Sequence, residues 1–367
     1  TLPISTWAKT SARDCRAIKQ KLTRESHEPR PNAVGLRRLR KNSRCERKLP
    51  RINRTWCLPR PKFPKRWPKH LRRVASVRLK AVDRVPRFLF PPPVAPVPRR
   101  SYRVQFPGGC GHELAGIVDR PDHRHTFPVA VFSHCFTCNK DLKAIVRISR
   151  ALADLGIGVL RFDMTGLGGS RGDFSHTSFS TNVADIKSAM RFASKELGPV
   201  TALVGLSFGG AASLAIAGNQ GLPGGVHGPA PAVVTLATPS DTVHLALLLS
   251  TMDPQIESQG IGSVTIGGRN WSIRREMLED FRRYDLPAAI SRVKSPTLLF
   301  HSPADATVGF DHAIRIMGLI QTSPSGGGPV SLITLDGADH LLSQRQEDID
   351  FVTATTAAFI NRYASPG

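Results

Sequence analysis

The amino-acid sequence of residues 101–367 predicts an α/β fold with an open, mostly parallel, doubly wound sheet, and three observations support this prediction. Short apolar runs alternate with segments of helical periodicity over this range. A G-x-S-x-G string, Gly205 to Gly209, lies between one such run and one such segment. The excess positive charge of the chain is confined to residues 1–100, which lack the alternation.

The predicted strands are short and apolar, which is typical of strands covered on both faces. In chain order they are 113–121, 127–134, 158–163, 200–205, 231–238, 296–302 and 330–337. Between and after them, helices are predicted over 141–156, 182–198, 208–218 and 346–364. Gly156 and Gly198 end the first two, as glycine often does at a helix C-terminus. Because strands and helices alternate, we expect parallel strands joined by crossover helices.

Residues 240–290 break this alternation. They contain "SVTIGGRNWSI", in which two apolar runs flank a Gly-Gly pair, a pattern that predicts a hairpin. We expect this stretch to form a small cap insertion over the pocket of a domain that spans 101–367.

Residues 1–100 hold 29 Lys and Arg against 5 Asp and Glu, and 14 of the 29 prolines. A segment with this much like charge and proline buries too little apolar surface to offset its ordering entropy, so it is predicted to be disordered. It could be a basic arm for nucleic-acid phosphates or anionic lipid, or a long targeting peptide. The favoured interpretation is that the segment has no selected function. Because the chain begins with Thr, we expect a fragment or a translation from a wrong start. Nucleic acid is therefore not an expected partner.

No apolar run reaches the 18 residues of a membrane span, and no secretory signal is visible. The six cysteines are Cys15, Cys45, Cys57, Cys110, Cys135 and Cys138. Their spacing is not that of a disulfide framework, so a reducing compartment, the cytoplasm, is expected.

Ser207 is the candidate nucleophile. It follows the strand 200–205 and opens the helix 208–218, which is the strand–turn–helix context of a nucleophile elbow. Gly205 and Gly209 suit a turn in which backbones approach closely. A serine also needs a base, and the base needs an orienting acid.

The acid and the base are expected in the order Ser, acid, His at the ends of later strands. Asp305 follows the strand 296–302, and His340 follows the strand 330–337. Asp163, at the end of another strand, is the second choice for the acid, although a structural role is favoured. His301 and His134 also lie at strand ends, and His301 is expected to be buried with its own hydrogen bonds. The remaining candidate acids, expected at the surface, are Asp311, Asp336 and Asp339.

An oxyanion needs two hydrogen-bond donors. One is expected from the backbone N–H of Phe208, after the nucleophile, and the other from the loop after the strand 127–134. In that loop Phe136 N–H is the first choice and Cys135 N–H the alternative.

The same loop contains Cys135-x-x-Cys138, next to His134. The pair could be redox-active, or part of a metal site. A structural zinc needs four ligands, and no second C-x-x-C or H-x-x-x-H occurs. The default is a packed loop with two small thiols, without metal.

Six stretches together resemble the α/β-hydrolase half of bacterial α/β-hydrolase–OsmC fusion proteins: "FSHCFTCNKDLKA", "GVLRFDMTGLGGSRGDF", "NVADIKSA", "LVGLSFGGAA", "FHSPADATVG" and "LDGADHLLS". The likeness covers about 101–365 and extends more broadly to serine-aminopeptidase-type and dienelactone-hydrolase-type enzymes. It implies an α/β-hydrolase fold with Ser207, Asp305 and His340 as the triad. Leu206 stands where the family more often has His, and the OsmC domain is absent.

The residues and the resemblance together predict a serine hydrolase that cleaves an ester, thioester or amide of a small-molecule acyl substrate without a cofactor. The alternatives are an acyltransferase with the same triad, and a non-catalytic hydrolase-like module.

Overall fold

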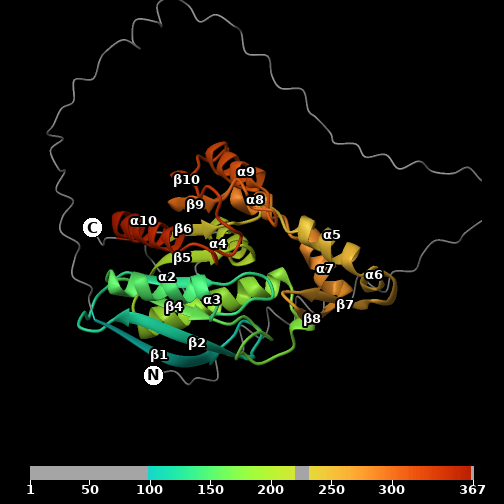
Figure 1. Cartoon of the computed structure of the whole chain (residues 1–367), viewed down its shortest axis with the longest axis horizontal. Coiled ribbons are helices and arrows are strands. Elements are labelled where there is room, and N and C mark those ends of the chain that lie inside the picture. Colours follow the sequence, from blue (N-terminus) through green and yellow to red (C-terminus); the bar gives the residue numbers. More distant parts are fainter. Residues whose placement is uncertain (1–97, 220–230, 365–367) are drawn as a thin grey trace, which may run out of the picture. The chain divides into compact units, whose positions relative to one another are not determined.

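The computed structural model describes residues 98–219 and 231–364. Apart from its last three residues, the basic segment 1–100 lies outside the described residues. The predicted disorder of this segment therefore remains a prediction. The described residues form a central sheet of eight strands in the order β1-β2-β4-β3-β5-β6-β9-β10 (Figure 1). β2 runs antiparallel to both of its neighbours, and all other pairs are parallel. The predicted α/β, mostly parallel fold is therefore confirmed.

The strands of the sheet agree with the predicted apolar runs, with one addition. Their bounds are β1 Arg99–Pro107, β2 Glu113–Pro121, β3 Val129–Ser133, β4 Gly158–Phe162, β5 Val200–Leu206, β6 Ala232–Leu236, β9 Thr297–His301 and β10 Val330–Thr334. β1 was not predicted, because it is an edge strand with a single buried residue, Phe106. It begins at Arg99, so the expected boundary at residue 100 cuts through a strand.

Helices cover both faces of the sheet. α2 (Lys143–Asp154) and α10 (Gln346–Ala364) pack on one face. The other face carries α3 (Phe179–Glu196), α4 (Phe208–Gly218), α8 (Leu286–Ile290) and α9 (Phe310–Gln321). Alternate strand residues divide between the two hydrophobic clusters: Ala202 and Val204 face α2 and α10, and Leu203 faces the opposite side. This is the two-residue period of a strand buried on both faces.

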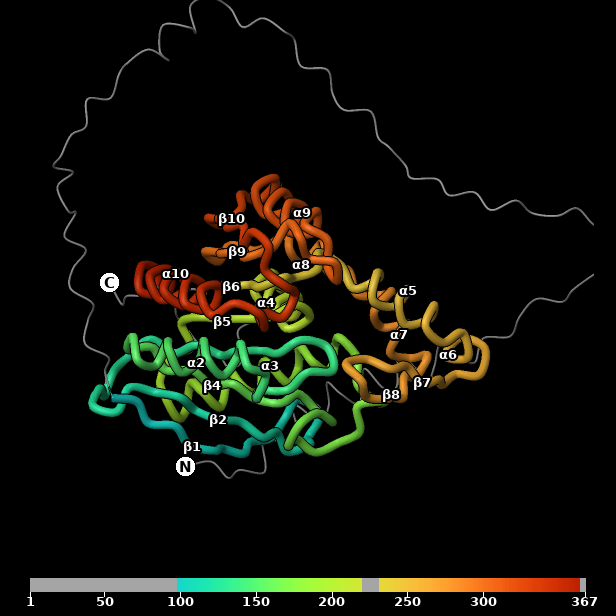
Figure 2. The backbone as a smooth tube through the Cα atoms, viewed as in Figure 1, coloured from blue at the N-terminus to red at the C-terminus, as the bar shows by residue number. Residues whose placement is uncertain are grey.

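The stretch 240–290 leaves the sheet after β6 and forms its own small group of elements. These are α5 (Val243–Met252), α6 (Gln255–Gln259), β7 (Ile261–Ile266), β8 (Arg269–Arg274) and α7 (Arg275–Arg283). β7 and β8 form the predicted hairpin, with Gly267 and Gly268 at positive φ in its turn. Figure 2 shows these elements together at one side of the sheet, whereas α8 packs back against α4.

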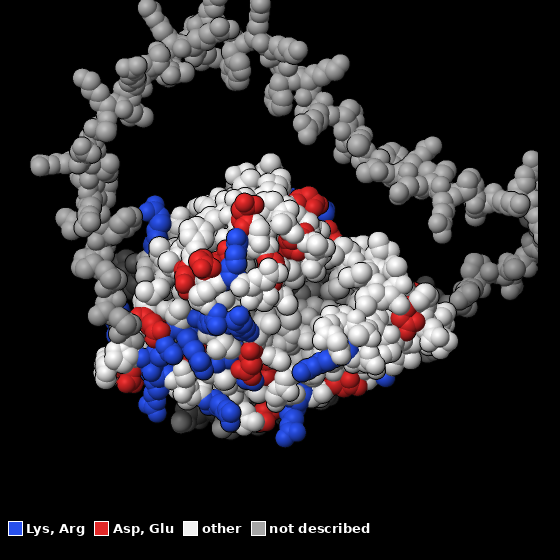
Figure 3. Space-filling model, in the orientation of Figure 1, with Lys and Arg blue, Asp and Glu red and all other residues white. Residues whose placement is uncertain are grey.

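Charges are balanced over the part of the chain that forms the sheet and its helices. Residues 101–367 contain 22 Lys and Arg and 23 Asp and Glu. Figure 3 shows acidic and basic side chains interspersed over the face that it draws. Within the described ranges, no helix combines the length and the apolar character needed to cross a bilayer.

An ion-pair network around the buried Arg161 joins β2 and β4 to the loop after β3. The Arg161 guanidinium, 2% exposed, donates from Nε to Asp119 (2.9 Å) and from Nη1 to Asp141 (2.9 Å). Lys140 Nζ lies 3.0 Å from Asp141 and 2.9 Å from the fully buried Asp163. The network ties β2, β4 and the loop together.

We predict that Arg161→Leu lowers the free energy of unfolding by about 3–5 kcal/mol, because it leaves the buried Asp119 carboxylate without a counter-ion. The double variant Arg161→Leu/Asp119→Leu should lose less, since both charges are removed. Urea denaturation of the three proteins measures both effects. A single variant as stable as the unmodified chain would contradict the prediction.

Three histidine side chains are removed from water when the chain folds. Burial lowers the pKa of His134, His301 and His312 below the usual value of 6.5. The unfolded chain therefore binds more protons than the folded chain just below pH 6.5. The stability that these neutral rings contribute is present above pH 6.5 and is lost as pH falls towards their folded pKa values.

We accordingly expect the melting temperature to be lower at pH 5.5 than at pH 7.5. The carboxylates with depressed pKa values do not contribute in this window, because their usual value is 3.8. In His301→Gln the difference between the two melting temperatures should shrink. Equal melting temperatures at both pH values in the unmodified protein would show that the prediction is wrong.

Candidate active site

Ser207 lies in a sharp turn between β5 and α4. Its backbone has φ 53° and ψ −118°, a combination that side chains avoid and that marks a strained turn. The two flanking glycines explain how the turn fits. A Cβ at Gly205 would lie 2.4 Å from Gly210 N, and a Cβ at Gly209 would lie 2.4 Å from Ser133 O. The G-x-S-x-G pattern is thus required by backbone contacts within the elbow and with the end of β3.

Hydrogen bonds fix this turn on both sides. Ser207 N–H donates to Leu236 O at the end of β6 (2.7 Å), and Ser207 O accepts from Gly210 and Ala211 in the first turn of α4. The serine is therefore held at the N-terminus of a helix, where developing negative charge is favoured.

The structure brings the three predicted triad residues together. His340 Nε2 lies 3.1 Å from Ser207 Oγ, and His340 Nδ1 lies 2.7 Å from Asp305 Oδ2. The Asp305 side chain is fully buried and that of His340 is 14% exposed. Because a carboxylate only accepts, Nδ1 carries the proton and Nε2 is free to accept the serine proton.

Asp305 is held in its ionised form. Burial alone would raise the pKa of Asp305, but hydrogen bonds from His340 and from the backbone N–H groups of Val308 and Thr307 outweigh it and lower the pKa below 3.8. The carboxylate thus keeps its charge beside the imidazole over the neutral range.

The other candidate residues take supporting places. His301 is buried and its Nε2–H donates to Val308 O (2.8 Å), as expected for a buried histidine. Asp163 does not reach His340 but accepts from Gly169 N–H and from Lys140, so it holds two loops.

Of the acids expected at the surface, Asp311 and Asp336 are exposed. Asp339 is only half-buried and accepts from Ser343 and Gln344 N–H, which closes the loop after His340. The sequence carries no signal for this role, because it depends on how that loop folds back.

The loop after β3 places Phe136 beside the elbow. The rings of Phe136 and Phe208 lie 5.4 Å apart, and neither residue's N–H donates a hydrogen bond within the described part of the chain. The His134 carbonyl lies against Gly209, where an added Cβ would be 2.6 Å from it. Because N–H and C=O of a trans peptide point in opposite directions, Cys135 N–H faces away from the elbow. Phe136 N–H as the second oxyanion donor remains a prediction.

The cysteines of this loop differ from the expectation. Cys135 and Cys138 form a disulfide with their Cα atoms 5.3 Å apart, instead of two packed thiols. The sequence spacing permits this bond, but only the turn of the loop brings the two Cβ atoms within reach. Over 98–219 and 231–364, no group of three His, Cys, Asp or Glu side chains has the placement of a metal site.

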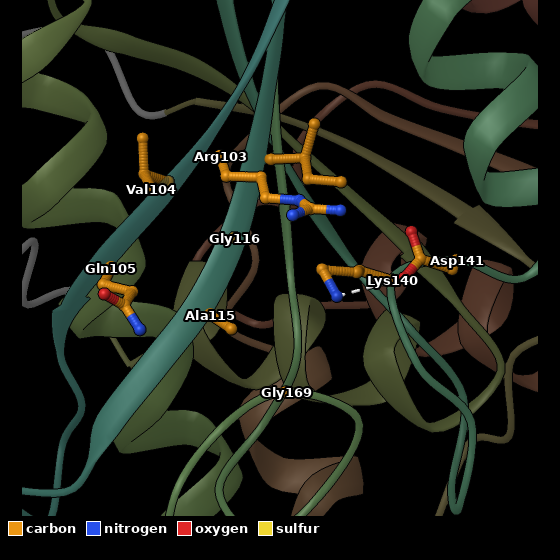
Figure 4. A pocket seen from close by; sticks show the side chains of 9 residues that line it. Arg103, Val104, Gln105, Ala115, Gly116, Lys140, Asp141 and Gly169 are labelled. Atoms are coloured by element: carbon orange, nitrogen blue, oxygen red, sulfur yellow. Dashed lines mark hydrogen bonds and ion pairs between the residues drawn. The ribbon is translucent and has the colours of Figure 1, made fainter.

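A cavity of about 660 Å³ adjoins the far end of this loop (Figure 4). Arg103, Gln105 and Gly116 of the β1–β2 edge line it, together with Lys140 and Asp141 of the loop. Lys140 is paired with Asp141 across its wall, as the dashed line in Figure 4 marks. None of its nine lining residues belongs to the Ser207–His340–Asp305 group.

An aromatic cluster joins the elbow and its loop to the insertion 240–290. Phe208 contacts Phe136 and Phe281 of α7, with ring centroids 5.4 Å apart in both pairs. Phe174, in a short 3-10 helix (η3, Phe174–His176), contacts Phe136 at 5.4 Å and Trp271 of β8 at 5.0 Å. The insertion therefore packs directly against the residues that surround the nucleophile.

Comparisons with known proteins agree with this architecture. The chain is similar to the esterase domain of a Rhodothermus marinus protein, with 34% identity and a TM-score of 0.54 over 72% of this chain and 100% of that one. It also resembles Est1E from Butyrivibrio proteoclasticus, solved with ferulic acid, with 19% identity and a TM-score of 0.59 over 72% of this chain and 100% of that one. A putative hydrolase from Agrobacterium vitis S4 is similar as well, with 21% identity and a TM-score of 0.56 over 72% of this chain and 99% of that one. A comparison with curated proteins finds no match. The model of the alpha/beta hydrolase family matches residues 125–352, more than half of the sequence, so the chain belongs to the alpha/beta hydrolase family.

Proposed function

We propose that this chain is a serine esterase whose catalytic triad is Ser207, His340 and Asp305. The observation that carries the proposal is the pair of hydrogen-bond distances, 3.1 Å from His340 Nε2 to Ser207 Oγ and 2.7 Å from Nδ1 to Asp305. The 34% identity to an esterase domain supports ester cleavage over other bond types. These distances also argue against the alternative of a non-catalytic module, which has no need for an aligned base.

The reaction follows from the roles that the geometry allows. Ser207 Oγ attacks the acyl carbonyl while His340 Nε2 takes its proton. His340 then returns this proton to the leaving oxygen, and a water completes the cycle through the same base. Asp305 holds the ring and stabilises the imidazolium. The N–H groups of Phe208 and Phe136 are proposed to bind the oxyanion.

Two finer assignments belong to the same proposal. The motifs of the chain favour kinship with the hydrolase half of the OsmC fusion proteins, and through it with serine-aminopeptidase-like and dienelactone-hydrolase-like enzymes. A cytoplasmic location is also proposed. Because disulfides in the cytosol are mostly transient or regulatory, that location implies a Cys135–Cys138 pair that cycles between disulfide and dithiol.

We expect Ser207→Ala to abolish labelling by a fluorophosphonate probe and to lower kcat for p-nitrophenyl esters by about 10³-fold or more, because the nucleophile is lost. Ser258→Ala, at an exposed position of helix α6, is the matched control and should be labelled normally. Undiminished labelling of a folded Ser207→Ala protein would overturn the triad. Product analysis with an added alcohol distinguishes hydrolysis from acyl transfer.

The insertion 240–290 is proposed to select the acyl group through the aromatic cluster. Trp271 is half-buried and reaches Phe136 through Phe174. Trp271→Ala should change the ratio of kcat/KM for long-chain and short-chain esters by about 10-fold, since each methylene in an apolar pocket contributes about 1–3 kcal/mol of discrimination.

Ile261→Ala, on the exposed part of β7, provides the control for this measurement and should leave the ratio unchanged. The same ratio in Trp271→Ala as in the unmodified protein would exclude the cluster from substrate selection.

A further inference from the structure

The peptide between Cys135 and Phe136 is held from its carbonyl side. Cys135 O accepts one hydrogen bond from His134 Nδ1 (2.8 Å) and another from Cys138 N–H (3.2 Å). In a trans peptide the N–H points opposite to the C=O. Two donors on the Cys135 oxygen therefore fix the direction of the Phe136 N–H, which has no partner within the described ranges.

The His134 ring is itself locked in place. Its Nε2 accepts from Met164 N–H (3.1 Å), just past the end of β4, and the ring is 1% exposed. Burial lowers the pKa of His134, so the ring is neutral near pH 7 and its single proton lies on Nδ1, facing the Cys135 oxygen. The ring thus links the rigid sheet to one peptide of the loop.

The loop does not favour this conformation on its own. Thr137 has φ 60°, a left-handed backbone that a β-branched residue rarely adopts. The strained residue lies between Cys135 and Cys138, whose disulfide closes the turn around it. The covalent bond and the His134 hydrogen bond together oppose relaxation of the turn.

We propose that His134 and the Cys135–Cys138 disulfide are positioning groups of the oxyanion hole, and that opening the disulfide lowers kcat. This inference rests on the proposed function, because it concerns the donor Phe136 N–H in the transition state. Neither group touches the substrate. Both act by holding the Cys135–Phe136 peptide in the orientation in which its N–H meets the developing oxyanion.

A small dithiol can reduce the Cys135–Cys138 disulfide by itself, with no other reactant. One thiolate of the dithiol attacks a sulfur of the disulfide and forms a mixed disulfide. The second thiolate of the dithiol then attacks the dithiol sulfur of this mixed disulfide and releases the cysteine that was bound to it. Cys135 and Cys138 gain two electrons and two protons in total, and the reductant leaves as its own disulfide. Cys138 is half-buried, which offers the reductant a point of attack.

The test compares the full chain before and after treatment with dithiothreitol. We expect kcat to fall about 10-fold or more, short of the 10²–10³-fold loss that follows complete removal of a donor, with KM nearly unchanged. The affinity for a trifluoromethyl ketone, whose adduct with Ser207 carries an oxyanion, should fall by a similar factor. Reoxidation should restore both values.

Variants separate positioning from folding. Cys135→Ser/Cys138→Ser should have the kcat of the reduced protein, and dithiothreitol should not change it. A change in kcat of this variant on reduction would reveal an effect of the other cysteines. His134→Leu should lower kcat, and His134→Asn, which retains a donor for the Cys135 oxygen, should recover part of it. All assays are made well below the measured melting temperature of each variant.

Several outcomes would overturn the inference: an unchanged kcat after verified reduction, a change in KM alone, or a double cysteine variant with full activity and full affinity for the ketone. Failure of the proposed function looks different. In that case the oxidised, unmodified protein would not be labelled by a fluorophosphonate at all. If only the inference fails, labelling of Ser207 still reaches completion.

Discussion

The site depends on the contact between the β5–α4 turn and the end of β3. Gly209 lies so close to the Ser133 and His134 carbonyls that no side chain fits between them. This contact brings the nucleophile and the loop after β3 within reach of one carbonyl group. Backbone packing therefore positions the Ser207 turn against the loop after β3.

Polar groups buried around this contact supply the rigidity that apolar packing cannot. The loop after β3 is held at its start by the His134 ring and at its end by Lys140 and the carboxylate of Asp163. Buried polar groups are costly unless they are paired, so each partner restricts the other to one geometry. The same reasoning applies to Asp305, whose two backbone donors orient it towards His340. A network of this kind favours a single arrangement of the site.

The insertion 240–290 contacts the site through side chains and not through backbone packing. It has its own hairpin and helices, and it meets the site mainly through aromatic rings on α7 and β8. The insertion therefore meets the residues around Ser207 through apolar side chains, whereas the turn that holds Ser207 is positioned by backbone contacts.

The sequence by itself determined seven of the eight strands of the sheet, the helices α2, α3, α4 and α10, and the choice of Ser207, Asp305 and His340. These depend on hydrophobic periodicity and on position relative to strand ends, which are local properties of the chain. β1 was not predicted, because an edge strand buries few side chains and so lacks a clear apolar run. Only the tertiary structure decided the rest: the Cys135–Cys138 disulfide, the ring of His134 on the Cys135 oxygen, and the tie between Lys140 and Asp163. Each depends on the direction of one peptide or side chain within a folded loop, and no pattern in the sequence encodes that direction.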